Sequence, residues 1–191
     1  MTTGPGRRVA LGLVHYPVLD REGAVITTAV TNLDIHDLSR SARAYALSGV
    51  LLIHPVPAQR ELIERVRAHW VSGGSGARRI PDREAALSLV RAVPSLDEAV
   101  SALAEGGEAP ELWTTAATAQ GEVTSYPAAR ERLEQRGPPV LLLFGTGWGL
   151  ERSVLERAAL RLAPIEGRGD WNHLSVRAAA AISLDRLLGH R

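Results

Sequence analysis

Residues 140–150, VLLLFGTGWGL, decide the fold. The first five are continuously apolar, which is typical of a strand buried on both faces of a parallel sheet. Gly145, Gly147 and Gly149 follow at alternate positions, before a predicted helix over residues 150–160. Glycine lets the backbone turn tightly and approach a ligand closely, and open parallel sheets bind ligands at the carboxyl ends of their strands. The turn is therefore a candidate binding loop, although a tight turn without a ligand fits the same pattern.

Two nucleotide-binding alternatives fit this glycine turn less well. No lysine follows in the phosphate-loop position, and the glycine spacing is not GxGxxG. A dinucleotide-binding fold would place the turn early and an acidic residue after the next strand. Here the turn comes late, and no acidic residue stands at that distance.

The rest of the chain repeats the alternation of strand and helix. Apolar or β-branched runs predict strands over residues 9–14, 50–54, 111–115 and 161–165, while residues 84–93 are ambiguous. A helix is expected from Asp34 or His36 to about Leu47, with Gly49 in the position of a C-terminal cap. Further helices are predicted over residues 59–71, 95–105, 126–136 and 173–188. This order indicates an α/β fold with a mostly parallel sheet and helices on both faces.

The composition is that of one compact domain over residues 1–191. Hydrophobic residues make up 45% and aromatic residues only 4%, so aliphatic side chains must build the core. The formal net charge is +1, which exerts no strong overall attraction on polyanions. An RNA partner would need local cations such as Arg78, Arg79 and Arg168, or cations from a second subunit.

Cysteine is absent, which excludes disulfides and thiolate metal sites. No cluster of metal ligands at metal spacing is visible. No apolar run approaches the roughly 18 residues of a membrane span, and no signal-peptide core follows the N-terminus. A cytoplasmic protein with no metal and no membrane partner is the expectation.

A second candidate segment covers residues 164–188. Asp170, Asn172, His173 and Ser175 gather where a loop enters an alanine-rich helix. Each has a structural alternative: Asn172 as the helix N-cap, His173 as a first-turn residue, Ser175 as a partner for a backbone group, and Asp170 as a solvated loop residue.

A third candidate segment covers residues 28–49. Asn32 stands just before the predicted helix, and Arg40 and Arg43 share one helix face. Two arginines on one face suit a phosphate or carboxylate. A solvated face paired with Asp37 is the alternative.

Together, the three segments resemble the SPOUT class of methyltransferases. The strings HYPV, ITTAVTNLDIHDLSR, LFGTGWGL and NHLSVRAAAAISLDRL are similar to a bacterial subgroup related to the C-terminal domain of tRNA (guanine-N1)-methyltransferase. The resemblance implies a C-terminal trefoil knot, an S-adenosylmethionine cofactor, an RNA substrate (tRNA or rRNA) and a homodimer with the last helix at its interface.

The resemblance also implies which residues contact the cofactor, largely through backbone groups of three loops. These are Thr114, Thr115 and Ala116; Phe144, Gly145, Thr146, Gly147, Trp148, Gly149 and Leu150; and Pro164, Ile165, Asn172, Leu174 and Ser175.

By the same resemblance, Asn32 with Arg40 or Arg43 matches a catalytic Asn and Arg of the ribose 2′-O branch, and Asp170 is a candidate base for a ring nitrogen. The chain departs from the guanine-N1 enzyme: we expect neither that enzyme's long domain after the knot nor its acidic and glycine-rich active-site strings. Substrate identity therefore does not carry over. A protein or small-molecule substrate, or a cofactor-binding protein without transferase activity, remains the alternative.

Overall fold

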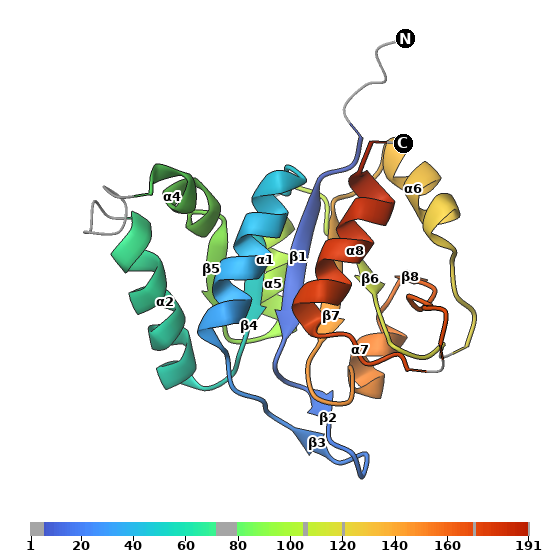
Figure 1. Ribbon diagram of the computed structural model, residues 1–191, viewed down its shortest axis with the longest axis horizontal. Coiled ribbons are helices and arrows are strands. Elements are labelled where there is room, and N and C mark those ends of the chain that lie inside the picture. Colours follow the sequence, from blue (N-terminus) through green and yellow to red (C-terminus); the bar gives the residue numbers. More distant parts are fainter. Residues whose placement is uncertain (1–5, 72–79, 105–106, 120, 170, 191) are drawn as a thin grey trace.

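The computed structural model describes residues 6–71, 80–104, 107–119, 121–169 and 171–190. Its centre is a six-stranded sheet of order β5-β4-β1-β7-β6-β8, in which every neighbouring pair is parallel. Beyond the carboxyl end of β1, a short antiparallel hairpin pairs β2 with β3 (Figure 1). The strands are β1 (Val9–Val14), β2 (Val18–Leu19), β3 (Val25–Ile26), β4 (Val50–Ile53), β5 (Val90–Val93), β6 (Glu111–Thr114), β7 (Val140–Gly145) and β8 (Leu160–Arg161).

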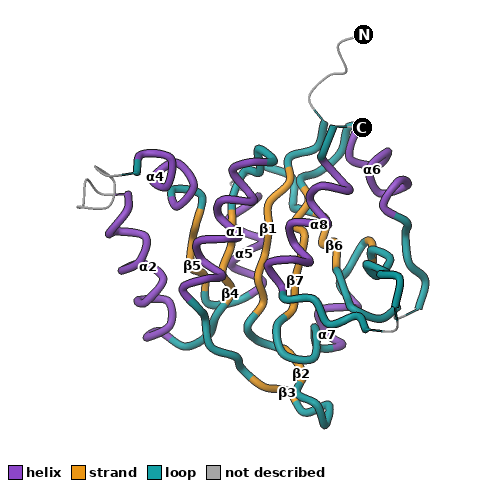
Figure 2. Tube along the Cα trace, viewed as in Figure 1, coloured by secondary structure: helices purple, strands orange, loops and turns teal. Residues whose placement is uncertain are grey.

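Helices cover both faces of the sheet, as the alternation of elements predicts (Figures 1 and 2). Along β1, Leu11 and Leu13 join the apolar cluster under one helical layer, whereas Ala10 and Val14 join the cluster under the other. In the described part of the chain, no helix has both the length and the apolarity to cross a membrane. The first layer holds α1 (Asn32–Ala44), α2 (Pro57–Val71), α4 (Pro81–Leu87), α6 (Tyr126–Glu134) and α8 (Val176–Leu188); the second holds α5 (Leu96–Ala104) and α7 (Arg152–Glu156).

The predicted ends of α1 were wrong at both termini. The helix begins at Asn32, because the Thr31 side chain accepts the backbone N–H of Asp34 and serves as the N-cap. It ends at Ala44, and Ala46 takes the left-handed conformation with φ 54° that was expected of Gly49. Gly49 instead lies directly before β4.

The start of α8 also differs from the prediction. Ser175, not Asn172, is the N-cap, and its hydroxyl accepts the backbone N–H of Ala178 at 3.2 Å. The reading of Ser175 as a partner for a backbone group is therefore confirmed. Residues 166–169 and 171–174, which precede α8, lie outside helices and strands.

Two other segments are divided differently from the prediction. The ambiguous residues 84–93 contain both the end of α4 and all of β5. The helix expected over residues 150–160 stops at Glu156, because the Ala159 N–H already bonds the Leu112 carbonyl of β6 at 2.9 Å.

A charged cluster supports β6 at the end of the sheet away from the hairpin. The Glu111 carboxylate contacts the guanidinium groups of Arg7 and Arg132 at 3.0 Å each and accepts the Trp113 indole N–H at 3.0 Å. Partial burial by itself raises the pKa of Glu111, but these hydrogen bonds outweigh it and lower the pKa from 4.5 to about 2.

We expect Glu111→Gln to remove a pH-dependent part of the stability. Because the pKa of Glu111 is lower in the folded state, its stabilisation is present above about pH 4.5 and is lost as the pH falls toward 2. The variant should be less stable than wild type by about 2 to 3 kcal/mol at neutral pH and converge with it near pH 2. Urea unfolding across this range measures the difference. Glu131→Gln, at an exposed glutamate, is the control. A difference in the free energy of unfolding between Glu111→Gln and wild type that does not change with pH would contradict the prediction.

Candidate cofactor site

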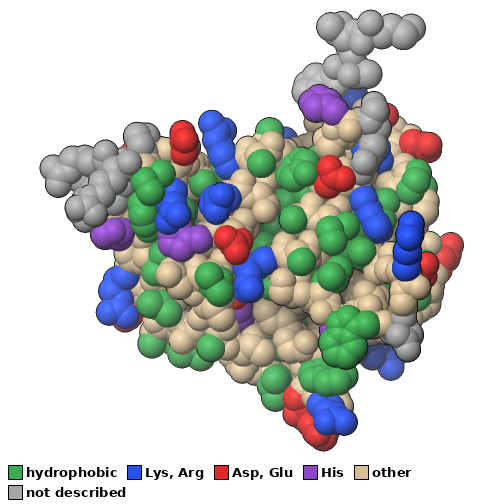
Figure 3. Space-filling view, in the orientation of Figure 1, with side chains coloured by type: hydrophobic (Ala, Val, Ile, Leu, Met, Phe, Trp, Pro, Cys, Tyr) green, Lys and Arg blue, Asp and Glu red, His purple; other side chains and the backbone are tan. Residues whose placement is uncertain are grey.

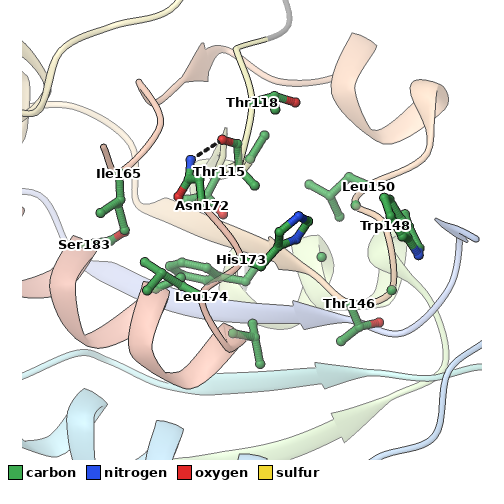
Figure 4. A pocket seen from close by; sticks show the side chains of 18 of the residues that line it. Thr115, Thr118, Thr146, Trp148, Leu150, Ile165, Asn172, His173, Leu174 and Ser183 are labelled. Carbon is green, nitrogen blue, oxygen red and sulfur yellow. Dashed lines mark hydrogen bonds between the residues drawn. The ribbon is translucent and has the colours of Figure 1, made fainter. Parts of the chain in front are cut away.

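A cavity of about 710 Å³ opens at the carboxyl ends of β6 and β7 (Figure 4). Three stretches far apart in sequence enclose it: the segment after β6, the glycine turn after β7, and the segment leading into α8. The lining residues are Thr115, Ala116, Ala117, Thr118, Tyr126, Phe144, Gly145, Thr146, Gly147, Trp148, Gly149, Leu150, Leu155, Ile165, Asn172, His173, Leu174, Val176, Ala179 and Ser183.

The three expected cofactor loops thus meet at one cavity. Of the individual residues expected to bind the cofactor, only Thr114, Pro164 and Ser175 do not line it. Thr114 is buried within β6, and Ser175 is engaged as the cap of α8. Pro164 is half-buried next to the lining residue Ile165.

The glycine turn is held against the β2–β3 hairpin. The Trp148 N–H donates to the Leu19 carbonyl at 2.8 Å, and the Leu19 N–H donates to the Gly149 carbonyl at 3.0 Å. Gly147 and Gly149 have φ of +58° and +115°, which disfavour any side chain. A Cβ on Gly147 would lie 2.6 Å from the Leu19 carbonyl oxygen, so this glycine permits the close approach of the two loops.

A chain of hydrogen bonds anchors Thr146, the first residue of that turn. Its hydroxyl donates to the Val14 carbonyl at 3.1 Å. The Thr28 hydroxyl, 2.5 Å away, must therefore donate to Thr146, and His15 Nδ1–H, at 3.0 Å, must donate to Thr28. The order of donors assigns His15 as the Nδ1–H tautomer, because a carbonyl can only accept.

Two histidines beside these threonines, His15 and His54, have lowered pKa values, which favours their neutral forms. Burial first, and then the neighbouring His54, lower the pKa of His15 from 6.5 to about 4. Burial likewise lowers the pKa of His54, whose Nε2 donates to the Thr28 carbonyl and whose Nδ1 accepts the Val56 N–H. Neutral side chains at this edge of the sheet hold the turn without placing a charge beside the cavity.

Two further hydrogen bonds join the walls of the cavity. Asn172 Nδ2 donates to the Ala117 carbonyl at 2.5 Å, which links the segment before α8 to the segment after β6 (Figure 4). The Tyr126 and Ser183 hydroxyls lie 2.8 Å apart and link α6 to α8. Asn172, considered in the sequence as a helix cap, thus connects two loops instead.

Sequence reasoning missed the helical wall of the cavity. Val176, Ala179 and Ser183 are spaced by three and four residues along α8, so they share one face and line the cavity. That spacing was visible in the sequence. Tyr126, Ala117, Thr118 and Leu155 had no such signal, because their approach depends on how the loops pack.

The candidate catalytic residues of α1 do not line the cavity. Asn32, Arg40 and Arg43 are exposed, and Asp170 lies outside the described residues, as do Arg78 and Arg79. Asp37, weighed as a partner of the two arginines, is instead 3.4 Å from Arg177 of α8, whose guanidinium also contacts Asp34 at 2.8 Å. In the described part of the chain, no ion pair involves Arg40 or Arg43.

The sequence matches a model of the SAM-dependent RNA methyltransferase family over residues 8–189. The chain belongs to that family. S-Adenosylmethionine (SAM) is accordingly the cofactor.

Two similar sequences and one solved structure illustrate what this chain resembles. It is 42% identical over 186 residues to a tRNA (guanine-N(1)-)-methyltransferase of Oleidesulfovibrio alaskensis, covering 97% of this chain but only 43% of that protein. It is 39% identical to an uncharacterized Aquifex aeolicus protein, covering 94% of this chain and 87% of that one. In fold it is similar to the SpoU methyltransferase AviRb of Streptomyces viridochromogenes, with a TM-score of 0.58 at 19% identity, over 96% of this chain and 60% of that one.

The cavity fits SAM in size and lining. Its volume lies within the roughly 300–1,000 Å³ of small-molecule sites. Its wall combines apolar side chains such as Phe144, Leu150 and Ile165 with loop backbone and the hydroxyls of Thr115 and Tyr126. Apolar faces beside backbone donors and acceptors suit a purine ring and a ribose.

Proposed function

We propose that this chain transfers the methyl group of SAM to a nucleotide of RNA, at the cavity between the glycine turn and α8. The observation that carries the proposal is the meeting of the three expected loops around one cavity at the carboxyl ends of β6 and β7. Because the chain spans less than half the length of the first tRNA (guanine-N(1)-)-methyltransferase that it matches, the choice of tRNA belongs to the proposal as well.

The proposal assigns cofactor binding to the three loops. The turn from Phe144 to Leu150 supports one side of the cofactor, and residues 115–118 with Ile165, Asn172 and Leu174 support the other. Thr114, Pro164 and Ser175 shape these loops from behind the lining. Polar recognition comes largely from the backbone, since most lining side chains are apolar or small.

Bound SAM supplies an electrophilic methyl group on a sulfonium. The chain must hold the acceptor atom in line with that methyl and take up its proton. Such positioning raises the rate of transfer by orders of magnitude. We assign Asp170 as the general base that takes the proton when the acceptor is a ring nitrogen. We assign Asn32, with Arg40 or Arg43, to the ribose or phosphate of the acceptor nucleotide.

Replacing Arg40 or Arg43 should separate the effect on RNA binding from the effect on cofactor binding. Arg40→Ala and Arg43→Ala should each leave the SAM dissociation constant unchanged, because neither side chain lines the cavity. Replacing the arginine that contacts RNA should raise the KM for RNA roughly ten- to a hundredfold, the loss of about one charged hydrogen bond. Loss of cofactor affinity in either variant would contradict the assignment.

Three architectural features complete the proposal: a single domain over residues 1–191, a trefoil knot formed by the segment before α8, and a homodimer. Two observations support the knot: Ile165, Asn172, His173 and Leu174 line one cavity with loops that precede them in the chain, and Asn172 donates to the Ala117 carbonyl. The alanine run of α8 permits the close backbone approach that a dimer interface needs. Sedimentation of the purified protein tests the dimer.

The deciding experiment is transfer of tritiated methyl from SAM to total RNA, with the tRNA fraction tested first. Label that disappears on ribonuclease treatment supports the proposal. Label that resists ribonuclease would assign a protein or small-molecule acceptor. No label with any fraction, in a protein that binds SAM by calorimetry, would leave a cofactor-binding protein without transferase activity.

A further inference from the structure

Aromatic side chains gather at the mouth of the cavity. Trp148 is 59% exposed and Trp171 is 77% exposed, although large apolar side chains normally gain from burial. His173 lies between them, with its ring centroid 6.1 Å from that of Trp148 and 4.9 Å from that of Trp171. We call these three residues the aromatic mouth.

The other two tryptophans are placed differently. Trp113 is fully buried in β6, and Trp70 packs edge-on against His36 and His69 with Arg83 over its ring. The chain therefore exposes its tryptophans most where the cavity opens. Exposed apolar side chains that gather in this way commonly mark a binding surface.

The aromatic mouth is continuous with the cavity. Trp148 and His173 line it, and Trp171 extends the same cluster beyond the lining. In Figure 4, the His173 ring lies between Asn172 and Trp148, over the space that the lining side chains enclose. Figure 3 shows large apolar side chains beside a hollow of the surface. Because Trp148 and His173 are exposed and line the cavity, an acceptor that enters beside them meets their rings.

The rings leave room for a flat partner. Both contacts of His173 are edge-on, with interplanar angles of 71° and 61°, so neither indole is covered by a parallel histidine ring. Aromatic faces stack readily on unpaired bases, and every base offers such a face. Nearby charges are mixed, with Arg168 close in sequence to Glu166 and Arg21 between Asp20 and Glu22. The aromatic mouth is thus better suited to stacking on bases than to neutralising phosphates.

We propose that the aromatic mouth stacks on an unpaired base of the RNA substrate and guides the acceptor nucleotide into the cavity. The inference rests on the proposed function, since it names how the same site takes its RNA. Trp171 contributes a binding face outside the cofactor cavity, and Trp148 contributes one at its edge.

Binding of a short single-stranded oligoadenylate, in the presence of S-adenosylhomocysteine, tests this inference. Stacking should quench tryptophan fluorescence, and an abasic oligomer of equal length should not. Trp171→Ala should weaken oligoadenylate binding at least about fivefold, the loss of one stacked base, while Trp171→Phe keeps most of the affinity. Trp70→Phe is the matched control at a remote tryptophan, and calorimetry should show unchanged SAM affinity in all three variants.

The possible outcomes separate the inference from the proposed function. If Trp171→Ala binds and methylates RNA like wild type, the aromatic mouth is not an RNA surface, while the proposed function stands. If the variant instead loses self-association with RNA affinity unchanged, the surface holds a second copy of the chain and the inference fails. Base-dependent quenching without any methyl transfer to RNA would support the binding surface and overturn the proposed activity.

Discussion

Replacing Gly147 by valine is expected to lower the affinity for SAM by roughly ten- to a hundredfold, or about 1.4 to 2.8 kcal/mol, in a chain that still folds. A β-branched residue strongly disfavours a φ of +58°. Its Cβ would also meet the Leu19 carbonyl at 2.6 Å, so the turn must move away from the hairpin. The displaced turn carries Thr146 to Gly149, all of which line the cavity.

Calorimetric titration of SAM measures this effect, and circular dichroism verifies the fold. Gly167→Ala is the matched control, because a Cβ at that exposed loop glycine meets nothing within 4 Å. A folded Gly147→Val protein with wild-type affinity would show that the turn does not hold the cofactor. The expected cause is backbone displacement by the hairpin contact, and not a side chain filling the cavity.

Replacing Arg177 by alanine is expected to destabilise the fold by about 2 to 4 kcal/mol, because it leaves the Asp34 carboxylate without its cationic partner. The Asp34 side chain is only 7% exposed and lies 2.8 Å from the Arg177 guanidinium. The hydroxyl of Thr31, the N-cap of α1, donates to the other Asp34 carboxylate oxygen at 2.6 Å and accepts the Asp34 backbone N–H at 3.2 Å. A buried carboxylate that loses its counter-charge is costly, whereas a neutral amide in its place is not.

A double-mutant comparison tests this explanation. Adding Asp34→Asn to Arg177→Ala should recover part of the lost free energy of unfolding, measured by urea denaturation. Arg152→Ala is the control, since its ion pair with Glu156 is exposed and should contribute less than about 0.5 kcal/mol. If the double variant is less stable than Arg177→Ala, the Asp34 charge is not the source of the loss. The pair also matters for function, because it ties α8, a wall of the cavity, to α1 with its candidate arginines.

Much of the site was predictable because its signals are local. The glycine turn, the apolar runs of β1, β4 and β7, and the alanine-rich α8 each depend on residues adjacent in sequence. Helix ends were less predictable, as the caps show. Thr31 caps α1 ahead of the expected start at Asp34 or His36, and Ser175, not Asn172, caps α8. In the case of Ala46, the left-handed turn falls on a residue with no sequence signal for it.

Buried runs and their alternation with helices determined from sequence alone that this chain is an α/β protein. They also marked the glycine turn late in the chain as a candidate binding loop. Only the tertiary structure decided which side chains line the cavity beside that turn. Asn172 donates to the Ala117 carbonyl, and α8 places Val176, Ala179 and Ser183 in the cavity wall. Asp37 pairs with Arg177 of α8, and not with Arg40 or Arg43 of its own helix. The physical reason is that these contacts join residues far apart in the chain, and their distances are set by how loops and helices pack on the sheet.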